Sequence, residues 1–254
     1  MSSVSSPVLW HIPPSHYSEK VRWALDHKGV AATRRAPMPP SHMPIALWLT
    51  RGREKTFPVL TLDGESIGDS TAIIAALERR YPEPALYPED PGERDRALAL
   101  EDFFDEELGA HSRLLAFHHL IHEPESIAEF TSSILPGPLV GHETVVRTAG
   151  RGAGVFTRVR YGVSSDTAAE TARSKILAAM DRLESELDRA GGEYLAGGAF
   201  SVADLTAASL FTPIVGPPEG QKLPEPVGEY EEFIAPLRER RGYRWVAQTF
   251  ARHR

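Results

Sequence analysis

Four consecutive polar residues, Ser15–Ser18, stand where a short apolar run gives way to a helical pattern. The apolar run is Val8–Trp10. The helical pattern continues to Gly29, a residue suited to the left-handed conformation that ends many helices. A hydroxyl at a helix N-terminus can donate a hydrogen bond to an anion that the helix end already attracts. This segment therefore predicts an anion site in a strand-to-helix turn.

Two later motifs add to this chemistry. Phe57–Leu60 places Pro58 directly before an apolar strand, and the pair Asp69-Ser70 opens another helix. The Asp69 carboxylate can hold an ammonium group, while the Ser70 hydroxyl and the first-turn N–H groups suit a carboxylate. The simpler interpretation makes Asp69 a helix cap only. Because the other motifs are present, we favour a dual role and predict a site for a small peptide-like anion.

Short elements must position these residues. The apolar runs and turn residues predict strands at Val8–Ile12, Ala32–Ala36, Val59–Leu62 and Glu65–Ile67, the last two joined by the hairpin signal Asp63-Gly64. Helical patterns predict helices at Ser15–Lys28, at Ser41–Thr50 and from Asp69 to Tyr81. The order is β-α-β-α-β-β-α, within a domain that we assign to residues 1–83.

A proline-rich linker, residues 84–92, separates this unit from an all-helical domain, residues 93–254. Ser201 and Asp204 form a capping-box pattern at one helix start. Pro213–Pro226 holds too many Pro and Gly residues for a helix and predicts a long loop. The helices expected here are Glu93–His122, Leu139–Thr148 continuing to Tyr161, Thr167–Ala190, one from Ser201, and one or two over Phe233–Ala251.

Composition narrows the possible partners. The 254 residues carry a formal net charge of -7, and the Arg clusters lie among acidic residues, which argues against nucleic acid or a membrane as partner. The absence of cysteine excludes disulfides and cysteine nucleophiles in this chain. Residues 1–7 lack a signal-peptide pattern, and no apolar run approaches the roughly 20 residues that span a bilayer. We expect a cytoplasmic protein.

Four motifs make the chain similar to the glutathione transferase superfamily, in its serine-type, bacterial-like form. They are Ser15-x-Tyr17-Ser18-x-Lys20-Val21-Arg22, Phe57–Leu60, Asp69–Ile73 and Phe200–Asp204. The resemblance implies an α+β chain, with a thioredoxin-like domain in which Pro58 is cis and an all-helical second domain. It also implies glutathione as co-substrate, a small apolar electrophile as the second substrate, and a homodimer.

The resemblance also assigns roles. Ser15 is the implied catalytic hydroxyl, which stabilises the glutathione thiolate. Lowering the thiol pKa by about two units takes roughly 2.7 kcal/mol, within reach of one charge-assisted hydrogen bond and a helix end. The Val59 backbone would pair with the cysteinyl part of glutathione, and Arg51, Arg53 or Lys55 would hold its glycyl end. The implied glutathione contacts are Tyr17, Ser18, Lys55, Phe57, Pro58, Val59, Asp69 and Ser70.

The chain departs from the family pattern beside Ser15. His16 stands where proline is common, and Tyr17 and Ser18 offer further hydroxyls, which leaves open which hydroxyl acts on the sulfur. For the second substrate we expect a pocket whose candidate residues are His11, His16, Phe104, His111 and Phe117. Because the aromatic residues of Glu93–His122 recur at helical spacing, we expect one face of that helix in the core and another on the pocket.

A metal is not expected. His111, His118 and His122 share one predicted helix face, and two His residues four apart can bind zinc, but the sequence shows no nearby third ligand. Several functions remain open at this point. The first is conjugation of glutathione to an apolar electrophile. The same activated thiol would serve a lyase, a dehalogenase or an isomerase. The others are an enzyme that uses another low-molecular-weight thiol, and a non-catalytic binding or regulatory protein on the same fold.

Overall fold

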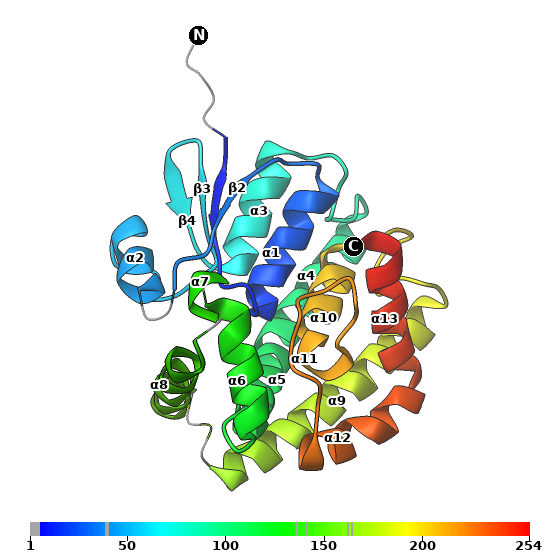
Figure 1. The fold of residues 1–254 in the computed structure, drawn as a ribbon. Coiled ribbons are helices and arrows are strands. Elements are labelled where there is room, and N and C mark those ends of the chain that lie inside the picture. Colours follow the sequence, from blue (N-terminus) through cyan, green and yellow to red (C-terminus); the bar gives the residue numbers. More distant parts are fainter. Residues whose placement is uncertain (1–5, 39–40, 136, 141, 162, 164) are drawn as a thin grey trace.

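The protein is described from a computed structural model, which covers residues 6–38, 41–135, 137–140, 142–161, 163 and 165–254. A sheet with three helices forms the N-terminal unit, and the described residues after it are helical or loop (Figure 1). The predicted thioredoxin-like β-α-β-α-β-β-α order is confirmed. Its elements are β1 Val8–Trp10, α1 His16–His27, β2 Thr33–Arg35, α2 His42–Leu49, β3 Val59–Leu62, β4 Glu65–Ile67 and α3 Ser70–Arg80.

The sheet has the strand order β2-β1-β3-β4. β1 runs parallel to β2, with Val8 opposite Thr33, and antiparallel to β3, with Leu9 opposite Leu60. β3 and β4 form the predicted hairpin, whose turn residues Asp63 and Gly64 have φ of 49° and 87°. Two positive φ angles suit the tight turn that a two-residue hairpin needs. The Phe57–Pro58 peptide bond is cis, as the family resemblance implies.

The two faces of the sheet are covered by different helices. α2 covers one face, where Ala46 packs with Phe57 and Val59. α1 and α3 cover the other, and their buried side chains join one core that continues into the helical unit. α1 also packs against α10 of the helical unit. The N-terminal end of α1 therefore lies where the two units meet.

One predicted helix is divided in the structure. The pattern over Glu93–His122 runs as α4 Pro91–Phe104, a π-helical turn η1 Asp105–Gly109, and α5 Ala110–Leu120. Residues 124–134, for which no helix is predicted, form a helix that starts at a proline, a residue suited to the first helical turn. The remaining elements are α6 Pro124–Ile134, α7 Gly137–Val140, α8 Glu143–Tyr161, α9 Asp166–Ala190, α10 Val202–Leu210, α11 Thr212–Val215, α12 Gly228–Ile234, η2 Ala235–Glu239 and α13 Arg241–His253.

Helix α9 has 25 residues and packs against several other helices of the helical unit. Its buried residues Ile176, Met180, Leu183 and Leu187 recur at spacings of four, three and four, which places them on one face. α5 and α13 pack against this helix. The start of α10 carries the predicted capping box between Ser201 and Asp204. The loop predicted over Pro213–Pro226 is wrong at its start, because α11 takes in residues 213–215; the segment from there to α12 contains no helix or strand.

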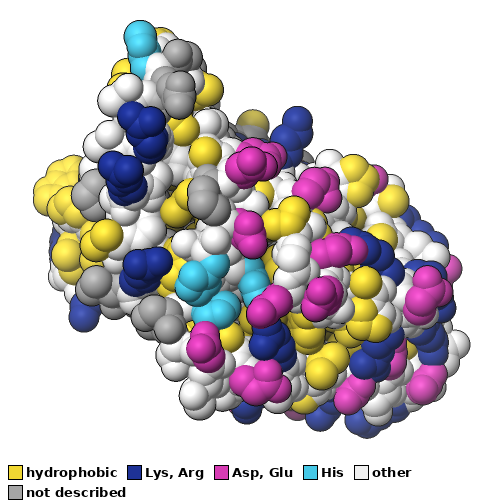
Figure 2. Space-filling view, turned by 60° about the horizontal axis from the view of Figure 1, so that its bottom comes forward, with side chains coloured by type: hydrophobic (Ala, Val, Ile, Leu, Met, Phe, Trp, Pro, Cys, Tyr) yellow, Lys and Arg dark blue, Asp and Glu magenta, His cyan; other side chains and the backbone are white. Residues whose placement is uncertain are grey.

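One face of the protein carries charges of both signs (Figure 2). Figure 2 shows Lys and Arg side chains lying among Asp and Glu over much of one face, together with a group of histidines. Interspersed charges of this kind are typical of a solvated protein surface. Among the residues that the structure describes, no helix combines the length and the apolar character needed to cross a lipid bilayer.

Candidate functional site

A large cleft lies between the N-terminal unit and the helical unit, with a volume of about 1210 Å³. One side is formed by the β1–α1 loop, the segment before β3 and the start of α3. The other is formed by α4, η1, α5 and α6, with contributions from α8 and the 213–227 segment. Of the residues predicted from sequence, eight line this cleft: Ser15, His16, Tyr17, Phe57, Pro58, Asp69, Ser70 and Phe117.

Ser15 is the N-cap of α1. Its Oγ accepts a hydrogen bond from the Ser18 backbone N–H at 3.3 Å. This bond uses an oxygen lone pair of Ser15 and leaves the hydroxyl proton available to a group in the cleft. The first N–H groups of a helix have no carbonyl partner within the helix, so they add positive potential at the same place.

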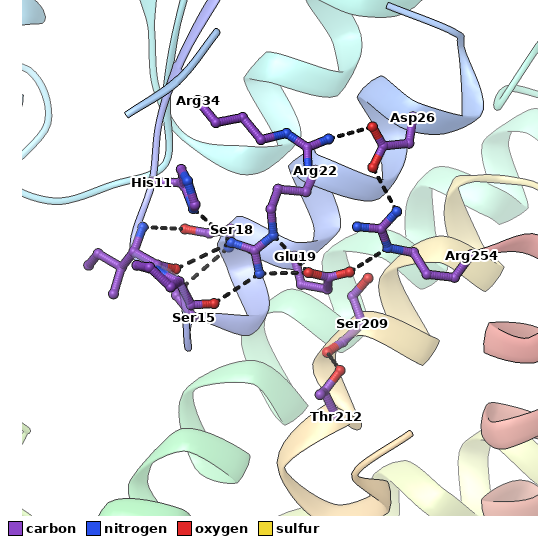
Figure 3. Close-up of polar contacts among 12 residues, drawn as sticks. His11, Ser15, Ser18, Glu19, Arg22, Asp26, Arg34, Ser209, Thr212 and Arg254 are labelled. Carbon is purple, nitrogen blue, oxygen red and sulfur yellow. Dashed lines mark hydrogen bonds and ion pairs between the residues drawn. The ribbon is translucent and has the colours of Figure 1, made fainter. Parts of the chain in front are cut away.

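The loop that carries Ser15 is held by side chains of the helix that follows it (Figure 3). The Ile12 N–H donates to Ser18 Oγ at 3.2 Å, and the Arg22 guanidinium donates to the carbonyl oxygens of Ile12 and Pro13 at 3.4 and 3.0 Å. Arg22 is itself buried and paired with Glu19 at 2.6 Å. The position of Ser15 therefore depends on Arg22 and Ser18.

Arg22 also contacts His11. Arg22 Nη1 lies 2.9 Å from His11 Nδ1, and Arg254 extends the network by pairing with Glu19 at 2.6 Å (Figure 3). Burial, and then the charges of Arg22 and Arg34, lower the pKa of His11 to about 4. His11 is thus a buried, neutral hydrogen-bond partner of Arg22 and does not line the cleft.

His16 and Tyr17 bridge from α1 to the π turn. His16 Nε2 donates to the Gly109 carbonyl oxygen at 2.8 Å, and Tyr17 Oη donates to the Asp105 carbonyl oxygen at 2.9 Å. A Cβ at position 109 would lie 2.3 Å from Tyr17 Oη, so Gly109 permits this approach. Burial, and then the charge of Arg113, lower the pKa of His16 to about 3, and burial raises the pKa of Tyr17 to about 12. Both side chains are uncharged at neutral pH.

A buried ionic cluster lies beside this bridge. Lys20 Nζ is 2.8 Å from Glu101 and 2.7 Å from Asp105, and it donates to Thr71 Oγ1 at 3.2 Å. Thr71 in turn donates to Asp105 at 2.7 Å. The Lys20 and Glu101 side chains have no exposed surface. Burial raises the pKa of Glu101, opposed by the charge of Lys20. The cluster ties α1 and the start of α3 to α4 and η1.

The start of α3 presents the predicted acid and hydroxyl to the cleft. Asp69 Oδ1 accepts from the Ala72 N–H at 3.0 Å as the helix N-cap, and its side chain stays exposed. Ser70 is the first helical residue and is largely buried. Glu54 and His42 line the same end of the cleft, and sequence reasoning identified neither. Burial, and then the nearby Asp69 charge, raise the pKa of Glu54.

Apolar side chains form a wall on the helical side of the cleft. Phe117 and Phe130 meet edge-to-face with ring centroids 5.7 Å apart. Leu120, Ile134, Leu135 and Leu223 extend this wall from α5, α6 and the 213–227 segment. Arg113 lies one helical turn before Phe117 on α5 and also lines the cleft. Sequence reasoning missed Arg113, although the spacing of residues 113, 116, 117 and 120 marks one helix face.

Six predicted site residues lie outside the cleft lining: His11, Ser18, Lys55, Val59, Phe104 and His111. The pocket role predicted for Phe104 is corrected, because this side chain is fully buried and packs edge-on against Phe103 and Phe211. His111 lies near Glu107 and Lys175 instead. The Ser18 hydroxyl is buried against Ile12, and Lys55 is exposed. The Val59 side chain faces α2, which leaves only its backbone for a ligand.

Three histidines form a separate cluster, with His118 and His119 in the last turn of α5 and His122 two residues beyond its end. The His118 ring lies 5.3 Å from that of His119 and 5.0 Å from that of His122. His118 Nδ1 donates to the Val163 carbonyl oxygen at 2.6 Å, and His122 Nδ1 donates to the His118 carbonyl oxygen at 2.8 Å. Within the described residues, no group of three or more acidic or histidine side chains has the arrangement of a metal site. The His118 hydrogen bond links the last turn of α5 to the segment before α9.

Two family models match the sequence. The model of the glutathione S-transferase N-terminal domain matches residues 9–85, and that of the glutathione S-transferase C-terminal domain matches residues 166–235, together more than half of the chain. The chain belongs to the glutathione S-transferase superfamily. None of the curated proteins matches it significantly in sequence. The segment between the two matches holds α4 to α8, so the apolar wall of this transferase-fold cleft lies largely outside the matched residues.

Solved structures share this glutathione S-transferase fold over nearly the whole chain. A Tau class glutathione S-transferase from mango, Mangifera indica, superposes with a TM-score of 0.62 at 14% identity, covering 99% of this chain and 89% of the other. A beta-etherase from Sphingobium sp. strain SYK-6 gives 0.61 at 19% identity, covering 98% and 100%. A maleylacetoacetate isomerase from Anaeromyxobacter dehalogenans, with bound dicarboxyethyl glutathione, gives 0.55 at 20% identity, covering 99% and 91%.

Proposed function

We propose that this protein binds glutathione on the α1 and α3 side of the cleft, stabilises its thiolate through Ser15, and adds the sulfur to a small apolar electrophile. The observation that carries this proposal is the geometry of Ser15. Its oxygen already accepts the helix-capping N–H of Ser18, so its proton is free to be donated to a sulfur at the helix N-terminus.

The rest of this side supports a glutathione-shaped ligand. The exposed Asp69 carboxylate would hold the γ-glutamyl ammonium, and Ser70 with the first-turn N–H groups of α3 would hold the neighbouring carboxylate. The Val59 backbone, next to cis Pro58, would pair with the cysteinyl unit. For the glycyl carboxylate we propose His42, which lines the cleft, in place of the expected Arg51, Arg53 or Lys55, which do not.

Ser15 would act without being consumed. The thiol loses its proton to solvent base, and the Ser15 hydroxyl donates to the thiolate that remains. The thiolate attacks an electrophilic carbon held against the apolar wall, and the leaving group departs with the bonding electron pair. The family fold also carries an etherase and an isomerase, and these reactions start from the same activated thiol. We propose conjugation because the wall around Phe117 and Phe130 is apolar.

Calorimetric titration with glutathione tests the binding step. We expect saturable binding that Asp69→Ala weakens by about tenfold or more, since a charged hydrogen bond contributes roughly 1.5–3 kcal/mol. Ser15→Ala should change affinity little and raise the pKa of the bound thiol, read from thiolate ultraviolet absorbance. Absence of glutathione binding in the wild type would reject the proposal and direct attention to other thiols.

The homodimer implied by the resemblance stays a prediction. Sedimentation velocity on the purified chain measures its mass in solution directly. A monomer would leave the proposed chemistry in place, because every residue assigned to the site above comes from one chain.

A further inference from the structure

The charges that line the cleft are strongly unequal. Among the described lining residues, Arg113 is the one Lys or Arg side chain. Like charges disfavour an additional anion, so this lining by itself would oppose ionisation of a bound thiol. The lining carboxylates are Glu54, Asp69, Asp102, Asp105, Glu106, Glu123 and Glu225.

Two histidines of the cleft, His16 and His119, add no positive charge at neutral pH. His16 is neutral because burial, and then the charge of Arg113, lower its pKa to about 3, although the hydrogen bond that its Nε2 donates to the Gly109 carbonyl oxygen opposes this shift. Burial, followed by the neighbouring His118, lowers the pKa of His119 to about 4. The other titratable lining groups are His42, Tyr17 and Tyr230, and burial raises the pKa of both tyrosines. Arg113 is therefore the permanent positive charge of this lining.

Arg113 faces the residues that directly follow Ser15. Its guanidinium carbon lies 5.6 Å from the centroid of the Tyr17 ring, and its charge contributes to the lowered pKa of His16. Stacking on an aromatic ring holds a guanidinium plane in place while its charge stays active. Tyr17 is itself fixed by the Asp105 carbonyl oxygen and by close approach to Gly109. The geometry thus holds a cation beside the N-terminus of α1.

We propose that Arg113 is a second thiolate-stabilising residue, whose guanidinium offsets the carboxylates of the cleft and keeps the sulfur of bound glutathione ionised. This inference rests on the proposed function, since it concerns the same bound thiol. Ser15 supplies a directed hydrogen bond, and Arg113 supplies a positive potential that needs no contact with the sulfur. Removing that charge should raise the thiol pKa by about one unit, the order of effect of a unit charge in the same partly solvated cleft.

The test is a spectroscopic titration of glutathione bound to the full-length protein. Thiolate absorbance is followed against pH in the wild type, Arg113→Met and Arg113→Lys. We expect Arg113→Met to raise the pKa of the bound thiol by about one unit, a tenfold loss of thiolate below the pKa. Arg113→Lys should restore most of the wild-type value, because it restores the charge. Asp102→Asn, which removes a carboxylate from the same lining, should shift the thiol pKa in the opposite direction.

S-methylglutathione has no ionisable thiol, so its affinity reports contacts other than the charge on the sulfur. Arg113→Met should bind this thiol-blocked analogue with wild-type affinity and bind glutathione more weakly at neutral pH. If Arg113→Met binds glutathione normally and the bound thiol keeps its wild-type pKa, the inference is overturned and the proposed function stays intact. Failure of the wild type to bind glutathione would overturn both. Circular dichroism of each variant shows whether the fold is retained.

Discussion

The two sides of the cleft are held in different ways. On the α1 side, hydrogen bonds fix the residues that face the cleft: Arg22 holds the Ser15 loop, and the π turn holds His16 and Tyr17. On the α6–α8 side, the lining is mostly apolar, as at Phe130 and Ile134, and α8 packs mainly on α6 and α7. The first side lies within residues matched by a family model, whereas α6–α8 lies between the two matches.

This difference separates two tasks. Directional hydrogen bonds specify one geometry. A hydroxyl that must donate to a sulfur atom requires such a fixed geometry. Apolar contacts are not directional, so a wall built from them accepts substrates of varied shape and changes with little disturbance elsewhere. The α1 side should therefore be costly to alter, and the α6–α8 side should be tolerant. Four predictions test this contrast.

The largest effect is expected at Lys20. Its side chain is fully buried between Glu101 and Asp105, so Lys20→Met leaves the buried Glu101 carboxylate and the partly exposed Asp105 carboxylate without their cation. Breaking a buried ion pair from one side typically costs about 3–5 kcal/mol. We expect a loss of this size in the free energy of unfolding, measured in urea. Adding Glu101→Gln should recover part of it.

Arg80 provides the matched control. Its ion pair with Asp63 lies at 2.9 Å, but both side chains are nearly half exposed. Exposed pairs contribute little because solvent screens them. Arg80→Met should therefore leave the urea midpoint unchanged. Equal losses for Arg80→Met and Lys20→Met would show that the cluster between α1 and η1 has no special role in stability.

A second prediction concerns acid stability. The folded pKa values of His11, His16 and His119 are about 4, 3 and 4, against an ordinary value of 6.5. The folded state favours their neutral forms, so this stability is complete above pH 6.5 and falls as pH decreases toward those values. Each fully buried histidine removes up to about 1.4 kcal/mol per pH unit in that window.

Asp204 acts in the opposite direction. Burial raises its pKa to about 6 from 3.8, so its contribution is favourable at low pH and is lost as pH rises through about 6. Urea unfolding at about pH 7 and about pH 5 should still show a net loss in acid, because burial lowers the pKa of six histidines and raises that of only three carboxylates among the described residues. His16→Gln should reduce the slope, and His142→Gln, at an exposed position, should not. A slope equal to wild type in His16→Gln would contradict the prediction.

Much of this architecture follows from local sequence. Asp63-Gly64 predicts its hairpin, and the Ser201–Asp204 pattern predicts its capping box, because each depends on residues a few positions apart. The π turn could not be predicted in this way. Its carbonyl oxygens accept hydrogen bonds from Tyr17 and His16, about ninety positions earlier in the chain. Long-range contacts of this kind leave no local pattern.

In the candidate site, too, residues with a local signal were predicted and residues placed by long-range contacts were not. Ser15 was predicted as a hydroxyl at a strand-to-helix turn and Asp69 as a helix cap, and both are local signals. In the structure each residue caps a helix. The pocket role predicted for His11 is wrong, because its ring nitrogen Nδ1 lies against Arg22. Its position near a strand end does not reveal that contact. Phe104 and Phe117 have the same helical character in sequence. The π turn between them alters which later residues face the cleft, and only Phe117 does so.

A third prediction compares a glycine-to-alanine substitution in each of the two regions. At Gly109, an added Cβ would lie 2.3 Å from Tyr17 Oη and 2.7 Å from its Cζ, so Gly109→Ala must displace Tyr17. We expect a loss of about 1–3 kcal/mol in the free energy of unfolding, as for other overpacked sites. Gly152 lies inside α8, where an added Cβ would have no described atom within 4 Å. Gly152→Ala should stabilise by about 0.4–1 kcal/mol, because alanine favours the helix. Urea unfolding of both variants would contradict the contrast if the two changes had the same sign.

The smallest effect is expected on the apolar wall. Leu223 lines the cleft from the segment after α11 and is only half-buried, so Leu223→Ala should cost little stability. Removing part of an apolar contact weakens ligand binding by about 1 kcal/mol, or roughly fivefold. We expect the KM for an aromatic electrophile such as 1-chloro-2,4-dinitrobenzene to rise by about this factor, with the Kd of glutathione and the thiol pKa unchanged. If Leu223→Ala weakened glutathione binding instead, the wall would contribute to the thiol site, and the division of the cleft into a directional side and a tolerant side would fail.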